Sequence, residues 1–351
     1  MLLPMHLRIA VEEGPRLEES LEALLPVEPH LAYANFPPIA RREGALLPLH
    51  LGRWRAAARA LGVLVARDER DRPVAALGLE HRAFESAHFG MSMAKIEPTV
   101  ATPQEETRLA ALRGLYSTAY DTLRERGYEH LSVVASTQDR AACRAAQEVG
   151  GFHVGTKISW MQPLTGDGRE PQLSANLRFE IHERPTSATV EPGAWRRLHA
   201  WCAEAFDRGP YVFDFDVPHD RAAAVYRVWT EKAMSGEWAD VLVLVRDTDE
   251  VVAFHSMLLL DDLSRAAGVP IVGRGIGATL PGYHGLFTAL QRECSAVRPL
   301  GAEFLENETQ ASTVQTINVF GKLGHRCLRS IANFHMRLQE RGGGARSIDR
   351  G

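Results

Sequence analysis

The chain has 351 residues, of which 40 are Lys or Arg and 44 are Asp or Glu, so its formal net charge is −4. Hydrophobic residues make up 45% and charged residues 24%, which excludes a disordered, collagenous or coiled-coil chain. At about 150 residues per domain, this length predicts two domains. No run of Lys and Arg is longer than a pair, so we expect no nucleic acid among the partners.

The beginning of the sequence, MLLPMHLRIAVEE, lacks the basic segment and the long apolar core of a signal peptide. No apolar stretch of 18 residues follows, so we expect a cytoplasmic protein without a membrane partner. The cysteines are widely spaced and form no Cys-x-x-Cys pair: Cys143, Cys202, Cys294 and Cys327. They predict neither disulfides nor a metal cluster, and we interpret them as small buried apolar side chains.

The two halves of the chain share one order of predicted elements: helix, hairpin, long helix, strand, short helix and final strand. In the first half, a helix around Trp54 precedes strands at 63–68, 74–79 and 131–138. In the second half, a helix around Trp229 precedes strands at 242–247, 251–260 and 304–310. Each half is therefore predicted to be a mixed α/β (α+β) sheet with its own helices.

Turn-forming residues separate the two halves. Residues 164–175 are rich in them and poor in apolar side chains, which predicts a linker between a domain of residues 1–163 and a domain of residues 176–340. Residues 341–351 have too little apolar content to order themselves, and we expect a disordered tail.

Several short segments carry a family resemblance by their order and spacing: FESAHFGM at 84–91, FDFDVPHDR at 213–221, TQ at 309–310, KLGH at 322–325 and FH at 334–335. Over residues 50–340 they resemble the GNAT superfamily of acyl-CoA-dependent N-acyltransferases, in a tandem form similar to bacterial dTDP-fucosamine acetyltransferases. The resemblance implies two tandem GNAT-like domains, of which the first is degenerate, and acetyl-CoA (or another acyl-CoA) as co-substrate without a metal.

Coenzyme A carries a pyrophosphate, and the simplest receptor for it is a helix N-terminus with free backbone N–H groups. In the second half, two glycines precede an apolar helix that has no carboxylate before Glu293. An ordinary strand-to-helix turn is the alternative interpretation. The residues predicted to contact acyl-CoA lie on a strand and in this turn: Ile276, Gly277, Ala278, Thr279, Gly282, Tyr283, His284, Gly285 and Leu286.

The equivalent turn of the first half has a different composition. Thr102, Pro103 and Glu105 predict a capping box, whose side chains would consume the free donors of the helix. The carboxylates of Glu105 and Glu106 would also repel a phosphate. We therefore predict acyl-CoA in the C-terminal half only.

Attack of an amine on a thioester requires a group that accepts a proton and a donor for the developing oxyanion. The candidate bases are His255 on the hairpin and Glu308 at the end of strand 304–310. Alternatively, His255 is a histidine bonded on the sheet surface, and Glu308 is a helix-capping or solvated carboxylate. We expect the oxyanion donor on strand 276–279, where Gly277 permits an irregular backbone.

The leaving thiolate needs a proton donor as well. The resemblance places a tyrosine for this role where the chain has Phe320, which has no proton to give. Tyr283, His284 or an ordered water are the alternatives, and a thiol with a pKa of about 8.5 can also leave without full protonation.

Asp214 and Asp216 alternate with two phenylalanines, which predicts an edge strand with polar, solvated carboxylates. They form either an acidic lip for a cationic amine or an ordinary amphipathic strand. We expect the first half to be structural or to close one side of an acceptor cleft. His88 and His335 either face that cleft or are structural.

These observations predict an acetyl-CoA-dependent N-acetyltransferase acting on a small amine, and the resemblance favours an amino sugar or a nucleotide-linked amino sugar. One alternative is a catalytically degenerate tandem module that binds acyl-CoA or a protein partner. Another is a thioester reaction without transfer, such as hydrolysis or decarboxylation. We expect a monomer or a homodimer, and the acyl chain length stays open.

Overall fold

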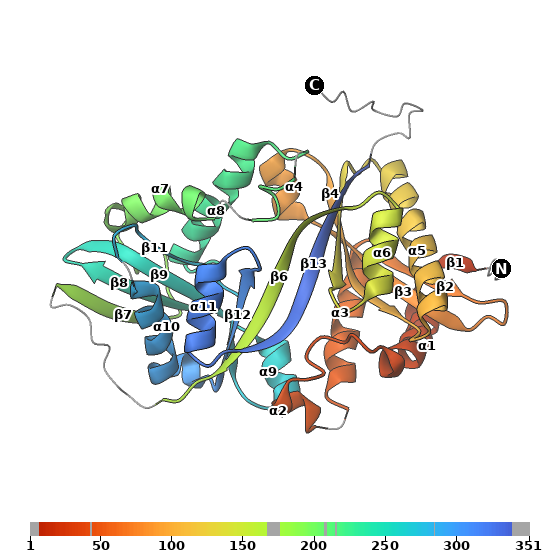
Figure 1. Ribbon diagram of the computed structural model, residues 1–351, viewed down its shortest axis with the longest axis horizontal. Helices are drawn as coiled ribbons and strands as arrows, with labels where there is room; N and C mark the ends of the chain where they lie inside the picture. Colours follow the sequence, from red (N-terminus) through yellow and green to blue (C-terminus); the bar gives the residue numbers. More distant parts are fainter. Residues whose placement is uncertain are drawn as a thin grey trace.

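The computed structural model describes residues 7–42, 44–166, 176–206, 209–214, 216–283 and 285–338. In this part of the chain, strands and helices form a mixed α/β fold around a sheet of 13 strands (Figure 1). The elements predicted from the repeat are confirmed. His284, the predicted tail and most of the predicted linker lie outside the described residues.

The N-terminal half follows the predicted order and adds a short strand and helices at its beginning. Its strands are β1 (Arg8–Glu12), β2 (Gly62–Arg67), β3 (Pro73–His81), β4 (Met93–Ala101), β5 (His130–Ser136) and β6 (Phe152–Pro163). Its helices are α1 (Gly14–Leu24), η1 (Leu25–Val27), α2 (Pro37–Ala40), α3 (Leu46–Ala60), α4 (Ala83–Phe89), α5 (Glu105–Glu125) and α6 (Arg140–Glu148).

The C-terminal half repeats this order. Its strands are β7 (Leu177–Glu183), β8 (Val241–Asp247), β9 (Glu250–Leu259), β10 (Ile271–Gly273), β11 (Gly277–Thr279), β12 (Phe304–Gln310) and β13 (Arg326–Arg337). Its helices are η2 (Pro192–Trp195), α7 (Arg196–Ala205), α8 (His219–Met234), α9 (Asp261–Ala267), α10 (Leu286–Val297), η3 (Pro299–Gly301) and α11 (Val314–Lys322). No helix among the described residues is long and apolar enough to cross a bilayer.

The two halves exchange their final strands. The strand order is β1-β2-β3-β4-β5-β13-β6-β12-β10-β9-β8-β7, with β11 paired to β9. β13 of the C-terminal half pairs with β5, and β6 of the N-terminal half pairs with β12. β6 and β13 also pair with each other, antiparallel, through the middle of the molecule (Figure 1). Because each half supplies a strand that the other needs, the hydrogen-bonded sheet is continuous across the sequence boundary.

Each half contains two neighbouring parallel strands that are hydrogen-bonded to each other over a few residues only. β4 pairs with β5 from Met93 to Ile96, and β10 pairs with β12 from Ile271 to Gly273. Beyond these residues the parallel ladder ends, and β11 continues the direction of β10 after a break. The backbone between the separated strands is therefore available to other partners.

Two apolar cores lie against the sheet. In the N-terminal half, Leu112, Leu115 and Tyr116 of α5 are fully buried against β2–β5. In the C-terminal half, β8 and β9 are apolar along most of their length and are covered by α7 and α10. Burial of each large apolar side chain stabilises the fold by about 1.5–3 kcal/mol.

The four cysteines are free. Cys202 and Cys294 are buried, as predicted, and Cys143 is half-buried. Cys327 is exposed, so the prediction of a buried side chain is wrong there. It lies at the exposed beginning of β13, next to Arg326.

Candidate active site

Strand β11 presents two backbone N–H groups to the space beside β12. One hydrogen bond lies at each end of its pairing with β9. The Ser256 N–H donates to the Ile276 oxygen, and the Leu280 N–H donates to the Val252 oxygen, both at 2.8 Å. Alternate residues of an antiparallel strand point to opposite sides, so the N–H groups of Gly277 and Thr279 point away from β9. The Trp201 indole N–H donates to the Thr279 oxygen on that side, at 3.1 Å.

The predicted irregular backbone lies just before β11 rather than at Gly277. Residues 274–276 interrupt the strand, and there the Ile276 N–H donates to Ser256 Oγ at 3.0 Å. The Ile276 amide is therefore occupied. A Cβ on Gly275 would lie 1.7 Å from the Ser256 carbonyl oxygen, so the close approach of the two backbones requires glycine at 275.

The beginning of α10 has the open character predicted for an anion cradle. Gly282 and Gly285 have φ of +92° and +80°, and a Cβ at either position would meet nothing within 4 Å. The helix has no side-chain cap and no acidic residue in its first turn. Its first N–H groups have no partner within the helix, although the Leu286 N–H donates to the Tyr283 carbonyl oxygen at 3.3 Å. The Tyr283 hydroxyl donates to Asp247 at 2.8 Å, which commits its proton. That these residues contact acyl-CoA stays a prediction.

The corresponding position in the N-terminal half is filled by the chain itself. The Glu28 carboxylate accepts the Ala101 N–H at 2.8 Å, at the end of β4. It also accepts the Arg108 guanidinium at 3.0 Å, and Arg108 bonds to Asp139 as well. Arg108 is 3% exposed, so this network is buried.

The predicted capping box of α5 is wrong. The N-cap is Gln104 and makes no side-chain cap, and the Thr102 hydroxyl bonds to the Gln104 side chain instead. Arg108 explains the difference, because its guanidinium donates to the carbonyl oxygens of Ala101 and Thr102 at 2.7 and 3.3 Å. These bonds hold the preceding residues outside the helix. The N-terminal site is therefore closed by Glu28 and Arg108 rather than by a capping box.

His255 lies in a buried polar chain beneath α10. Gln291 donates from Nε2 to His255 Nδ1 at 2.9 Å, and Asn307 donates from Nδ2 to Gln291 Oε1 at 2.9 Å. Asn307 Nδ2 also lies 3.1 Å from His325 Nε2. This direction of donation leaves the His255 proton on Nε2. His255 is thus a neutral, buried side chain and not a histidine on the sheet surface.

Glu308 is held as an ionised carboxylate. Lys157 Nζ lies 2.7 Å from it, and Ser159 Oγ donates to it at 3.1 Å. Burial raises the pKa of Glu308, but the ion pair with Lys157 outweighs burial and lowers the pKa to about 2. These contacts are those of an ion-paired carboxylate that is 19% exposed, and none of them caps a helix. A carboxylate with so low a pKa is a weak proton acceptor. The catalytic roles of His255 and Glu308 stay predictions.

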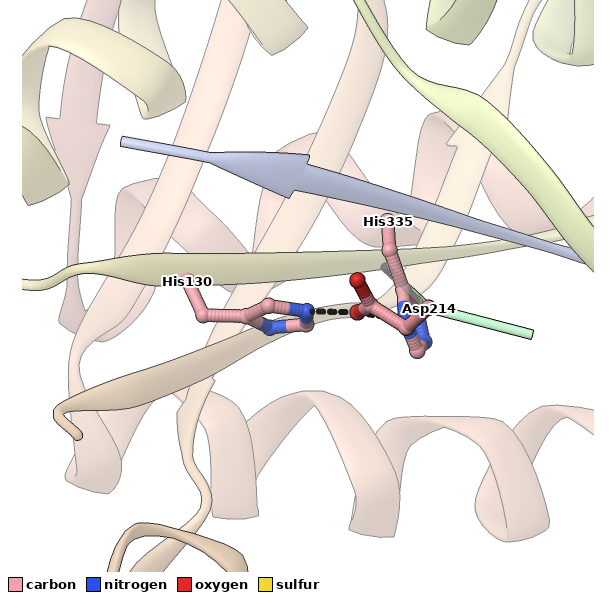
Figure 2. A group of neighbouring side chains, drawn as sticks. All are labelled: His130, Asp214 and His335. Carbon is pink, nitrogen blue, oxygen red and sulfur yellow. Dashed lines mark hydrogen bonds and ion pairs between the residues drawn. The ribbon is translucent and has the colours of Figure 1, made fainter. Parts of the chain in front are cut away.

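The prediction of a solvated edge strand around Asp214 is wrong. Residues 210–213 form turns, Asp214 is 2% exposed and Phe213 is 44% exposed, the reverse of the expected pattern. His130 Nε2 and His335 Nδ1 lie 2.8 and 2.6 Å from one carboxylate oxygen of Asp214 (Figure 2). Phe215 lies outside the described residues.

The bonds from His130 and His335 explain why Asp214 is buried. Burial raises the pKa of Asp214, but the hydrogen bonds from both imidazoles hold it well below its usual range. The three side chains join the segment before α8 to β5 and β13, and we call them the His–Asp–His cluster. Their ligand atoms lie within 4.8 Å of one another, as in metal sites. Metal binding would require breaking both bonds to Asp214.

Several residues of this region were not found from the sequence. Gln291 and Asn307 are buried, but each has charged neighbours in the sequence, so no local pattern indicated their burial. Glu28 and Arg108 gave no local signal. His88 is half-buried and lies 2.8 Å from the Arg221 carbonyl oxygen, so it contacts α8.

We expect acidification to destabilise the fold. Burial lowers the pKa to about 4 in four histidines: His50, His255, His325 and His335. Because the unfolded chain takes up these protons first, the free energy of unfolding falls as pH decreases from 6.5 to 4, by at most about 3 kcal/mol per histidine. Thermal unfolding followed by circular dichroism at pH 7, 6, 5 and 4 measures this. A midpoint independent of pH in this range would contradict it.

The whole chain matches solved structures of one fold. A GCN5-related N-acetyltransferase from Sphaerobacter thermophilus aligns over 95% of this chain and 96% of its own, with a TM-score of 0.58 and 12% identity. A tandem GNAT protein from the clavulanic acid biosynthesis pathway, solved without AcCoA, aligns over 95% and 99%, with a TM-score of 0.51 and 13% identity.

A third match is a GCN5-related glucosamine N-acetyltransferase region of a fungal multi-domain GH3 β-N-acetylglucosaminidase. It covers 95% of this chain and 38% of that one, with a TM-score of 0.57 and 12% identity. No protein-family model and no curated protein matches the sequence. The chain therefore has the mixed α/β fold of tandem GCN5-related N-acetyltransferases, as predicted.

Proposed function

We propose that the protein transfers an acetyl group from acetyl-CoA to a small amine, with acetyl-CoA bound by the C-terminal half. This proposal depends mainly on the contrast between the first turns of α10 and α5. The first turn of α10 is uncapped and free of carboxylates, whereas Glu28 and Arg108 fill the equivalent place beside α5. Both helices lack a side-chain cap, but α5 has Glu105 and Glu106 in its first turn and α10 has no acidic residue there, so α10 is the better receptor for a pyrophosphate.

The neighbouring strand suits the rest of the co-substrate. Gly277 and Thr279 of β11 turn their N–H groups away from β9, which supports a backbone contact to the pantetheine arm and an N–H donor for the oxyanion. Acetyl-CoA supplies the thioester that the amine attacks. Each of these roles requires a backbone donor and no particular side chain.

The two predicted bases contribute in different ways. Because Gln291 donates to Nδ1, His255 carries its proton on Nε2 and is suited to donating a hydrogen bond. It would have to release Gln291 before it accepted a proton. Glu308 is ionised and suits the binding of an ammonium group, whose proton then leaves through water.

The variant Gly285→Asp tests the cradle. Aspartate is among the residues that adopt a positive φ, and its carboxylate repels the pyrophosphate. Isothermal titration is expected to give micromolar binding of acetyl-CoA by the wild type and at least about tenfold weaker binding by the variant, or about 1.4 kcal/mol. Gly127→Asp is the matched control, because Gly127 also has a positive φ and open space around it. Equal binding by Gly285→Asp, or no binding by folded wild type, would contradict the proposal.

One observation favours a second candidate, a tandem module that binds acetyl-CoA without turnover. Phe320 is 2% exposed and stacks on His325 at 4.6 Å between ring centroids, so no phenol is available to protonate a thiolate there. Release of free thiol from acetyl-CoA, measured with a panel of amines that includes amino sugars, separates the two. Amine-dependent release supports transfer, release without amine supports hydrolysis, and binding without release supports the module.

A further inference from the structure

A cavity of about 180 Å³ joins the two halves and is lined by residues of both. Its walls are the separated parts of β4 and β5, the segment after η1, α3, and residues 328–331 of β13. Arg53 of α3 and Arg329 of β13 both line it. Their guanidinium carbons lie 6.0 and 5.3 Å from the centroid of the Tyr33 ring, so the two cations converge on one side chain.

Neither arginine makes a hydrogen bond to a carboxylate in the described part of the chain. Arg329 NH2 lies 3.8 Å from Glu308, which Lys157 and Ser159 contact more closely at 2.7 and 3.1 Å, and the buried Nε of Arg329 has no hydrogen-bond partner. Glu97 lines the same cavity, where burial raises its pKa but Lys95 and both arginines together lower it. Arg53 makes no ion pair within 4.0 Å in the described part of the chain. A guanidinium taken from water without a partner is costly, and a ligand that supplies one recovers that free energy.

At this end of the cavity, cationic side chains outnumber carboxylates, and Arg53 and Arg329 are the two in excess. Three carboxylates near this end of the cavity each have another cation: Glu97 with Lys95, Glu306 with Arg274, and Glu308 with Lys157. Five cationic side chains thus face three carboxylates. Elsewhere in the lining, Glu28 and Asp139 share Arg108, with no second cation paired to either among the described residues, which leaves a negative charge there. An anion entering the cavity is therefore directed to Arg53 and Arg329.

We propose that Arg53 and Arg329 bind an anionic group, a carboxylate or a phosphate, of the acceptor amine. This inference rests on the proposed acetyl transfer. A guanidinium bonds both oxygens of such a group through parallel N–H donors, and two guanidiniums around one anion select it over a neutral group. Arg329 also borders Glu308 on β12, the strand beside the proposed acetyl-CoA site. With its anionic group bound by the two arginines, the acceptor would extend its amine toward the C-terminal half.

The test titrates the full chain with inorganic phosphate and, separately, with succinate. The Gly285→Asp background is expected to abolish phosphate binding at the beginning of α10, so the remaining heat is assigned to the cavity. Arg53→Gln and Arg329→Gln are each expected to weaken anion binding at least tenfold. The matched controls are Arg55→Gln, an exposed residue of α3, and Arg326→Gln, an exposed residue of β13. Both are expected to bind the anion within twofold of the background.

Each outcome is informative. Tighter binding of phosphate identifies a phosphorylated acceptor, and tighter binding of succinate identifies a carboxylate. No binding of either anion, or equal binding by Arg53→Gln and Arg329→Gln, overturns the inference. Because neither arginine makes an ion pair shorter than 3.8 Å in the described part of the chain, both variants are expected to stay folded, with unfolding midpoints close to that of the wild type. Acetyl-CoA titration of the same variants, with Gly285 intact, is expected to be unchanged, so failure of acetyl-CoA binding is recognised separately.

Discussion

Replacing Arg108 by methionine is expected to lower the free energy of unfolding by about 3–5 kcal/mol. Arg108 is the one cation shared by the buried carboxylates of Glu28 and Asp139. Methionine fills a similar volume but leaves two negative charges buried without a counter-ion. The same change frees the Ala101 and Thr102 carbonyl oxygens. Urea unfolding followed by circular dichroism measures the loss.

The control for Arg108 is Arg113→Met on the same helix. Arg113 is exposed, and its contact with Glu148 is 3.5 Å long, so its replacement is expected to cost under about 1 kcal/mol. The double variant Glu28→Gln/Arg108→Met is expected to recover part of the stability, because one uncompensated charge is removed. Equal losses for Arg108→Met and Arg113→Met would show that the network does not hold this part of the fold.

Asp214→Ala is expected to lower the free energy of unfolding by about 3 kcal/mol, because it leaves two buried imidazole N–H groups without an acceptor. His130 and His335 both bond to the Asp214 carboxylate, and all three side chains are at most 4% exposed. The cluster is also a contact between the segment before α8 and the β5–β13 pair. Unfolding in urea measures the loss, and Asp214→Asn, which keeps one carbonyl oxygen, is expected to lose less.

A chelator distinguishes the hydrogen-bonded cluster from a metal site. If the two histidines bond to Asp214 directly, EDTA leaves the unfolding midpoint of the wild type unchanged. A midpoint that falls with EDTA and recovers with added zinc would instead show that the cluster holds a metal. An Asp214→Ala variant as stable as the wild type would contradict both interpretations.

The sequence alone determined the elements of each half and their order. Strands such as β8 and β9 are apolar along most of their length, and this pattern is local, so it is visible without the fold. The open beginning of α10 was also predictable, because Gly282 and Gly285 and the missing carboxylates are neighbours in the sequence. The interrupted strand before β11 was predicted within two residues of its position.

Only the tertiary structure decided how the halves are joined and which site is open. The exchange of β6 and β13 could not be read from the repeat, because either final strand has the same pattern in its own half or in the other. Glu28 reaches the Ala101 N–H from 73 residues away, and Asp214 reaches His130 from 84. A buried charge is decided by partners brought together in space, and such distant pairs leave no periodicity or motif in the sequence.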